Sequence, residues 1–436
     1  MYGIMPAEPD STVRSDLAWS SAGSALTLAA TIGMTIVLTR GHSPAVVAAV
    51  SSAAGLVMIL APLVTLGLPA AVVPLVARAP ENRRGSMART VVALTVGLAG
   101  AAAVVAATIV LVTVDGGRRG VFLALMLSLP AVATASVTEG AARAAGRFGV
   151  AFWLLDWSRR LLLIGALGLS AAVSVSVGGW LGVAVAAHTV LVVVLIRVAV
   201  PAAGREGAVP AGQVLRTSVH FVPMAMFGQI VPQAGVLVVD ALSGDVEVGK
   251  VAVGIRAYAA VSVLFVVATR VVAPRVARAE HLAPLGPWLR WMSARLTLVS
   301  LALTAAIVAG GPWLTGALFG GRYRDAWLPA ALFAGSVVVQ AGTGFGGMVL
   351  AQRGGQRLMA VVSLLSVAVF LAASLPAARA GGATGVALVS LGVMLVRGLV
   401  TTVIAERREH VRLWPGRPAA PSSAIHEVDG HHEQQG

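Results

Sequence analysis

The chain has 436 residues, of which 57% are hydrophobic and only 11% are charged, and its mean hydropathy is +0.87. A soluble domain carries about 25% charged residues, so this composition excludes an ordinary soluble protein and indicates a membrane protein. The net charge of +14 does not indicate a nucleic-acid partner, because the basic residues lie between apolar runs and form no stripe. The absence of cysteine excludes disulfides and thiol chemistry.

Runs of about 20 mostly apolar residues predict twelve transmembrane helices. The first run is too long for the apolar core of a cleaved signal peptide, about 7–15 residues, and is expected to be retained. The fold class is therefore an all-α polytopic membrane protein. The twelve predicted helices cover 17–39, 44–66, 90–114, 120–142, 151–174, 179–200, 217–240, 248–272, 296–318, 326–350, 358–378 and 382–404.

The basic residues gather in alternate loops. Arg83, Arg84 and Arg89 precede the third helix and would be inside, whereas the next loop carries only Arg118 and Arg119. Because Lys and Arg concentrate in cytoplasmic loops, this pattern predicts that both termini are cytoplasmic. We expect a multi-pass protein of the cytoplasmic membrane.

Two stretches of sequence recur six helices apart. "VVPLVARA" (72–79) ends the second predicted helix and "VAPRVARA" (272–279) ends the eighth. "RAAGR" (143–147) ends the fourth and "RGGQR" (353–357) ends the tenth. Since six is even, the two halves would have the same orientation and would be parallel repeats with a cavity between them.

The repeat divides the chain into two six-helix lobes. We expect an N-lobe over 17–200 and a C-lobe over 217–405, joined by a cytoplasmic linker, 201–216. A cytoplasmic segment, 1–16, precedes the first helix. The tail, 406–436, is rich in Pro, Ser, His and Gln and is predicted to be disordered, with no metal site assigned.

Three stretches carry a resemblance to a known family: 239–280, 314–361 and "LGLPAAVVPLVAR" at 66–78. They resemble helix hairpins of the Wzx-like polysaccharide flippases of the MOP superfamily, to which the MATE-type exporters also belong. In the first stretch the matching residues are Asp240, Gly244, Gly249, Tyr258, Pro274 and Arg278. The charge that is common in the first helix of the lipid II branch is missing, which disfavours lipid II.

The resemblance implies a V-shaped pair of lobes that opens alternately to the two sides. Its substrate would be a lipid-linked oligosaccharide or a related polysaccharide precursor. The expected partners are the lipid bilayer, this glycan, a polysaccharide polymerase and glycosyltransferases. The alternative on the same fold is a cation-coupled MATE-type multidrug exporter. No cofactor is expected, and H⁺ or Na⁺ could be the coupling ion.

Ionisable residues inside the predicted spans are candidates for the transport site, because a charge at mid-membrane costs about 2.5–3.5 kcal/mol. Arg256 would attract a pyrophosphate or an acidic sugar, and Asp240 would tune Arg256 or bind a coupling cation. Alternatively, the two would form a structural ion pair, or Asp240 would only contact water. Gln229 and Gln233 lie on the same helix face as Asp240 and suit sugar hydroxyls or interhelical hydrogen bonds. Gln340 precedes "AGTGFGG", which indicates a bend or close helix packing.

A second group of candidates consists of arginines at the predicted cytoplasmic mouth. They would gather an anionic lipid diphosphate, or would only set the topology and contact headgroups. These residues are Arg78, Arg278, Arg143, Arg147, Arg353 and Arg357. The stretch "DWSRR" (156–160) is expected at the membrane face, with Arg159 and Arg160 reaching to the headgroups.

The sequence carries no pattern typical of an enzyme. It has no Gly-rich phosphate loop followed by Lys-Ser/Thr, no metal triad and no Ser/His/Asp arrangement. A membrane polysaccharide polymerase or ligase would be expected to have a sizeable outer loop, and all the predicted outer loops are short. We therefore expect a transporter driven by gradients or by substrate supply.

Overall fold

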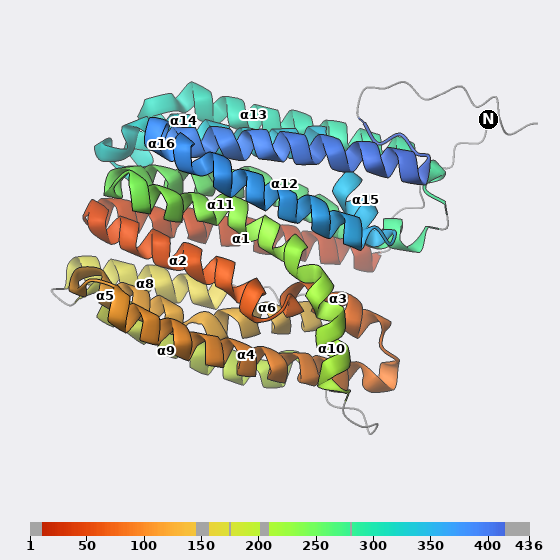
Figure 1. Ribbon diagram of the computed structural model, residues 1–436, viewed down its shortest axis with the longest axis horizontal. Helices are drawn as coiled ribbons and strands as arrows, with labels where there is room; N and C mark the ends of the chain where they lie inside the picture. Colours follow the sequence, from red (N-terminus) through yellow and green to blue (C-terminus); the bar gives the residue numbers. More distant parts are fainter. Residues whose placement is uncertain (1–10, 145–156, 174–175, 201–208, 280, 415–436) are drawn as a thin grey trace, which may run out of the picture.

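A computed structural model describes residues 11–144, 157–173, 176–200, 209–279 and 281–414. Every regular element in these ranges is helical, and the long helices run side by side along one direction (Figure 1). The all-α prediction is therefore confirmed.

The helices fall into two sets in chain order. The first set is α1 (Ser11–Gly41), α2 (Pro44–Val64), α3 (Leu68–Arg78), α4 (Arg84–Thr113), α5 (Gly116–Leu127), α6 (Leu129–Ala144), α8 (Trp157–Ala172) and α9 (Val177–Ala199). The second set is α10 (Ala211–Ser218), α11 (Val222–Leu242), α12 (Asp245–Arg278), α13 (Gly286–Phe319), α14 (Trp327–Gly342), α15 (Gly346–Gln352) and α16 (Gln356–Glu409). Short 3₁₀ turns join several of them: η1 (Glu81–Arg83), η3 (Val219–Phe221), η4 (Ala283–Leu285) and η5 (Gly321–Ala326).

Within the described ranges, eight helices are long and apolar enough to cross a membrane, or nine if the bent pair formed by α14 and α15 counts as one span. The longest, α16, has 54 residues, which at 1.5 Å per residue is more than twice a bilayer core. Its backbone leaves the helical conformation at Gly381 and Gly382, so it crosses twice. With α1 and α8, whose apolar parts are shorter in the described ranges, the order matches the twelve predicted helices.

Two of the predicted spans consist of two consecutive helices in the structure. The fourth span is divided at Ser128 between α5 and α6, and the second at Gly67 between α2 and α3. Gly67 has φ +74°, and a Cβ there would lie 2.8 Å from the carbonyl oxygen of Ser218. Glycine is therefore required twice, for the left-handed turn and for the close approach of η3. Hydropathy cannot predict such breaks, because the chain stays apolar through them.

The repeated stretches of sequence occupy equivalent places. Helices α3 and α12 end at Arg78 and Arg278, and the next residue, Ala79 or Ala279, is extended. A 3₁₀ turn and a long helix follow in both halves, η1 and α4 in one and η4 and α13 in the other. The paired valines are all fully buried: Val72, Val76, Val272 and Val276. The same local sequence therefore forms the same corner twice.

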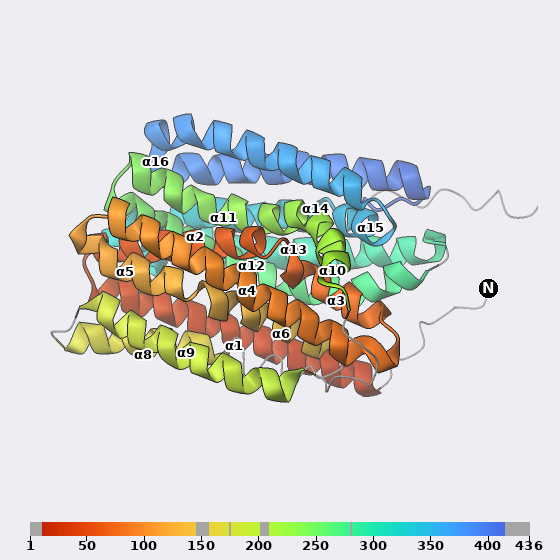
Figure 2. The same ribbon diagram turned by 60° about the horizontal axis from the view of Figure 1, so that its bottom comes forward.

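The two sets of helices form two lobes that meet along α1, α2, α11 and α12. Helices α4, α5, α6, α8 and α9 lie on one side, and α13 to α16 lie on the other (Figures 1 and 2). At the junction α2 packs on α11 and α12, while α1 packs on α8 of its own lobe and on α12 of the other.

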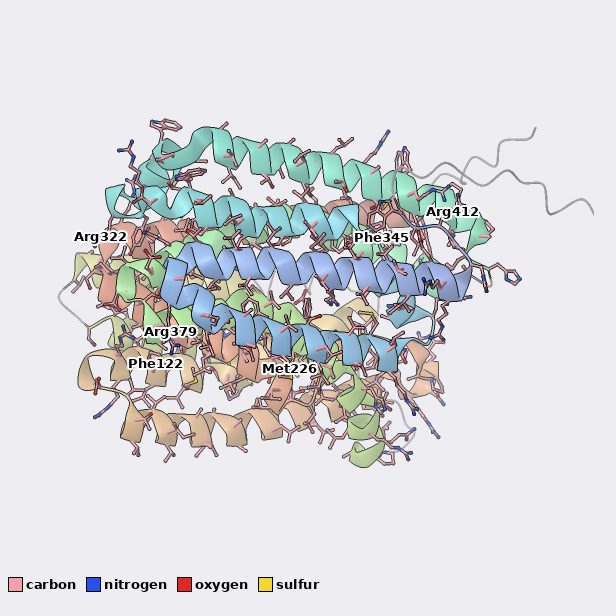
Figure 3. All side chains as sticks on the ribbon, turned by 45° about the horizontal axis from the view of Figure 1, so that its top comes forward. Phe122, Met226, Arg322, Phe345, Arg379 and Arg412 are labelled. Carbon is pink, nitrogen blue, oxygen red and sulfur yellow. The ribbon has the colours of Figure 1, made fainter. Side chains whose placement is uncertain are left out.

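Charged residues mark the two ends of the bundle. Arg322 and Arg379 lie at one end and Arg412 lies at the opposite end (Figure 3). The sequence predicts Arg322 and Arg379 outside and Arg412 inside. We call these the outer end and the inner end.

The orientation can be tested by labelling single cysteines, because the native chain has none. A Gly117→Cys variant at the outer end should react in intact cells with a membrane-impermeant maleimide. A Glu81→Cys variant at the inner end should react only after the membrane is permeabilised. The reverse pattern would overturn the predicted orientation.

Candidate functional site: a basic cavity between the lobes

A cavity of about 380 Å³ lies between the two lobes. Its walls come from α1, α2, α5, α6, α8 and α9 on one side and from α11 and α12 on the other. On α12 the lining begins at Ala252, seven residues below the outer start of that helix. At 1.5 Å per residue this depth is about 10 Å, so the cavity lies within the membrane thickness.

The cavity is positively charged. Arg159, Arg160 and Arg256 line it, together with His188, which is buried. The described residues that line the cavity include no Asp or Glu. A site with this lining attracts anions and repels cations, and the low surrounding dielectric strengthens both effects.

Two of the arginines, one from each lobe, are held by the same helix. The Nε of Arg256 on α12 donates a hydrogen bond to Oγ1 of Thr35 at 2.9 Å. Nη1 of Arg160 on α8 donates to Oγ1 of Thr31. Both threonines belong to α1 and are one helical turn apart, about 6 Å along the axis. Helix α1 therefore fixes the relative positions of the two guanidinium groups.

The two threonine hydroxyls also donate hydrogen bonds within α1. The hydroxyl of Thr35 donates to the carbonyl of Thr31 at 3.0 Å, and the hydroxyl of Thr31 donates to that of Thr27 at 2.7 Å. Each hydroxyl proton is thus used within α1, and the oxygen lone pairs accept from the arginines. In the sequence these threonines belong to a row in which threonine recurs at every fourth position: Thr27, Thr31, Thr35 and Thr39.

Three of the predicted cavity residues line the cavity in the structure: Arg256, Gln229 and Gln233. The two glutamines come from α11, and Tyr258 of α12 lies on the same lining. Amide and phenol groups can donate and accept hydrogen bonds, which suits sugar hydroxyls. The role of these residues in substrate binding stays a prediction.

Asp240 and Gln340 are not among the described residues that line this cavity, and their role in transport stays a prediction. Gln340 lies on α14 inside the second lobe. Asp240 lies at the outer end of α11, where its Oδ1 and Oδ2 accept hydrogen bonds from Nη1 of Arg118 at 2.9 and 3.1 Å. The expected partner, Arg256, is bonded to Thr35 instead, because its place on α12 is two to three turns deeper.

Two arginines of the first lobe close the outer end by bonding to the second lobe. Besides Asp240, Arg118 of α5 pairs through Nη2 with Asp245 at the start of α12. Arg40 at the end of α1 donates from Nε to the carbonyl of Leu318 at 3.0 Å and from Nη2 to that of Ala317, which are at the C-terminal end of α13. We call these contacts the outer latch.

The ion pair between Arg118 and Asp240 is the part of the latch whose exposure to water can be stated. Arg118 is about one-third exposed (35%) and Asp240 is largely buried (14%). Partly exposed ion pairs contribute about 0.2–1 kcal/mol, and 1 kcal/mol corresponds to roughly a fivefold population ratio. By itself this ion pair therefore stabilises the closed outer end only modestly.

Of the predicted mouth arginines, Arg353 makes contacts within the second lobe. Its Nε lies 3.2 Å from Oε2 of Glu409 on α16, and its Nη1 donates to the carbonyl of Ala279. Arg357 is exposed at the start of α16. For Arg78, Arg143 and Arg278 the description covers the backbone, at or near the ends of α3, α6 and α12, and Arg147 is outside the described residues. Their joint role as a mouth stays a prediction.

Two arginines lie in places that differ from their predicted positions, and a third makes a contact that the sequence did not predict. Arg159 and Arg160 were expected at the membrane face, but the side of α8 that carries them faces α1 and the cavity. Arg397, on the second half of α16, has its guanidinium carbon 3.9 Å from the centre of the Phe227 ring. This cation–π contact lies inside the second lobe, near Tyr258.

The described residues contain no group of three or more His, Cys, Asp or Glu that could hold a metal ion. The recognisable chemistry of the site is therefore that of its guanidinium, imidazole, amide and phenol groups.

Comparison with known proteins finds similar structures but no similar sequences. No known family's sequence profile matches the chain, and no curated protein matches it in sequence. Among solved structures, a mutant of the MATE transporter VcmN of Vibrio cholerae is similar, with a TM-score of 0.64 and 14% identity over 92% of this chain and 98% of that one. The lipid II flippase MurJ in an inward closed conformation has a TM-score of 0.63 and 9% identity over 89% of this chain and 87% of that one.

A third similar structure is a MOP superfamily transporter from Pyrococcus furiosus, described as having a binding pocket of reverse polarity. Its TM-score is 0.57, with 9% identity over 92% of this chain and 95% of that one. At these identities the likeness concerns the fold alone. The chain has the two-lobed, twelve-helix fold of the MATE and MOP transporters.

The outer latch predicts how the cavity is reached from outside. In a Ser51→Cys variant, whose cysteine would line the cavity on α2, adding Arg118→Ala should raise the rate of labelling by an impermeant thiol reagent from outside. We expect about a fivefold increase, because one interlobe ion-pair cluster is lost.

The matched control is Arg119→Ala. Arg119 is the exposed neighbour of Arg118, and its Nε donates to the carbonyl of Val114 in its own lobe at 3.1 Å. If both variants accelerate labelling equally, or neither does, the latch does not control access.

Proposed function

We propose that this protein is a flippase that moves a lipid-linked oligosaccharide, or a related anionic polysaccharide precursor, across the cytoplasmic membrane by alternating access. The observation that carries the proposal is the lining of the central cavity, with three arginines and a histidine and no carboxylate among the described residues. A diphosphate that links a lipid to a glycan is an anion of the kind that such guanidinium groups bind through paired hydrogen bonds.

The remaining lining suits the other parts of this substrate. Gln229 and Gln233 offer donors and acceptors to sugar hydroxyls, and apolar residues such as Met34, Leu163 and Val263 complete the wall. The volume of about 380 Å³ holds the diphosphate and the first sugars. The rest of a longer glycan would require the lobes to separate further.

Both lobes contribute to the site, which suits alternating access. Arg160 belongs to one lobe and Arg256 to the other, and both bond to α1. A bound anion that both guanidinium groups contact would favour the state in which they are close together. A ligand changes such an equilibrium only through contacts that differ between the two states.

The second candidate is a cation-coupled MATE-type multidrug exporter, which the fold likeness to VcmN favours. A cavity for organic cations needs acidic or aromatic groups to stabilise the positive charge. Here the ionisable groups on the described lining are basic, apart from the phenol of Tyr258, so the electrostatics disfavour this candidate.

The proposal predicts that removing a cavity arginine abolishes most of the transport. Arg256→Ala and Arg160→Ala should each lower glycan export at least tenfold when a flippase-deficient strain is complemented at equal protein levels. A charge-assisted hydrogen bond contributes about 1.5–3 kcal/mol, and about 1.4 kcal/mol is a factor of ten.

Arg275→Ala is the matched control, because Arg275 lies on the same helix as Arg256 but is exposed outside the cavity. It should export as well as the wild type. Full export by both cavity variants would contradict the proposal. Efflux of a cationic dye by the wild type, with no glycan export, would favour the multidrug exporter.

A further inference from the structure

A second hollow lies at the inner end, away from the central cavity. Its volume is about 600 Å³, and it is bounded by α3, η1 and α4 of the first lobe and by α10 and η3. Gln356, the first residue of α16, completes the wall. Helix α10 runs across the direction of the long helices (Figure 1), so it lies roughly in the plane of the membrane face.

The rim of the hollow is basic and its floor is apolar. Arg83, Arg216 and His220 are exposed on the rim. Leu75, Met87 and Phe221 form the floor. The described residues that line the hollow include no carboxylate.

The histidine has a defined tautomer. Its Nδ1 lies 3.1 Å from the carbonyl oxygen of Arg216, and because a carbonyl only accepts, Nδ1 carries the proton. The hydrogen bond holds the ring against α10, beside the guanidinium-bearing residue of the same helix. The rim thus combines two permanent cations with an oriented imidazole.

The internal repeat allows the corner beneath this hollow to be compared with its counterpart in the second lobe. Gly85 and Gly286 are both buried in the first turn of α4 and of α13, and aligning them pairs Met87 with Trp288. The repeat also pairs Leu75 with Arg275. In the second lobe the guanidinium carbon of Arg275 lies 5.0 Å from the centre of the Trp288 ring, so a larger pair of side chains stands at this corner. In the first lobe the smaller Leu75 and Met87 leave the corner open.

We propose that this hollow binds the phosphate group of a membrane lipid, with the phosphate on the basic rim and the start of the hydrocarbon chain on the apolar floor. The chemistry required is a phosphate ester attached to an apolar tail, at the end predicted to be cytoplasmic. An anionic phospholipid and a polyprenyl phosphate both provide it. The site is separate from the central cavity and does not depend on the proposed transport of a glycan.

The position of the hollow links it to the junction of the lobes. Helix α10 and η3 lead directly into α11, which carries Gln229 and Gln233 into the central cavity. On the other side, α3 follows the left-handed Gly67, whose backbone is in close contact with Ser218 and Val222. A lipid in the hollow would therefore contact both sides of the joint about which the lobes meet.

The test is native mass spectrometry of the purified full chain with three added lipids: phosphatidylglycerol, undecaprenyl phosphate and uncharged diacylglycerol. The double variant Arg83→Ala/Arg216→Ala should bind the phosphate lipids at least about tenfold more weakly than the wild type, because each basic residue near a lipid headgroup contributes to its attraction. The control Arg89→Ala/Arg407→Ala removes two exposed arginines outside the hollow and should stay within about twofold of the wild type.

A second variant fills the floor without changing the charge. Met87→Trp copies the residue of the other lobe and should weaken binding of the phosphate lipids while the melting temperature is unchanged. A loss confined to undecaprenyl phosphate would identify a polyprenyl phosphate as the occupant, and a loss confined to phosphatidylglycerol would identify a phospholipid. Equal binding by all variants, or equal binding of diacylglycerol, would overturn the proposal.

Discussion

The hydrogen bonds from Arg160 and Arg256 to successive threonines of α1 connect the two lobes at mid-membrane. A guanidinium group in this environment is stable only if its donors are satisfied. Because the described lining has no carboxylate, neutral hydroxyl groups satisfy part of this requirement. The described lining of the cavity is thus basic, and a basic lining attracts a mobile anion.

The contacts at the two ends differ in strength and in kind. At the outer end, Arg118 and Arg40 reach from one lobe to carboxylates and helix-end carbonyls of the other. At the inner end, η3 packs against Gly67 through backbone atoms, with no room for a side chain. Ion pairs with water access can separate and re-form at low cost, whereas close backbone packing is short-ranged and depends on shape. The proposed alternating access would therefore separate the lobes more easily at the outer end than at the close backbone contact of Gly67.

The sequence predicted the features that depend on composition and periodicity. The twelve apolar runs, the loop positions and the six-helix repeat follow from hydropathy and from the recurrence of "VARA", and Arg256 follows from the cost of a charge inside a span. The partners of Asp240 could not be predicted, because they depend on how the end of α5 meets the turn between α11 and α12. The sequence also could not predict which side of α8 faces the cavity. Arginines near the end of a span, such as Arg159 and Arg160, are equally compatible with contact to lipid headgroups and with lining a cavity. The threonine row was visible as a spacing, but its role required the arginines from two other helices.

The repeat places Leu75 where the other lobe has Arg275, and Met87 where it has Trp288. The two lobes therefore differ from each other at this corner. Two parallel repeats alone would present the same surface to lipids arriving from opposite sides. Here one corner carries a guanidinium against an indole ring, and its counterpart borders an open hollow. Although the chain is built from a repeat, the two lobes therefore present unequal corners to the surrounding lipid at this end of the bundle.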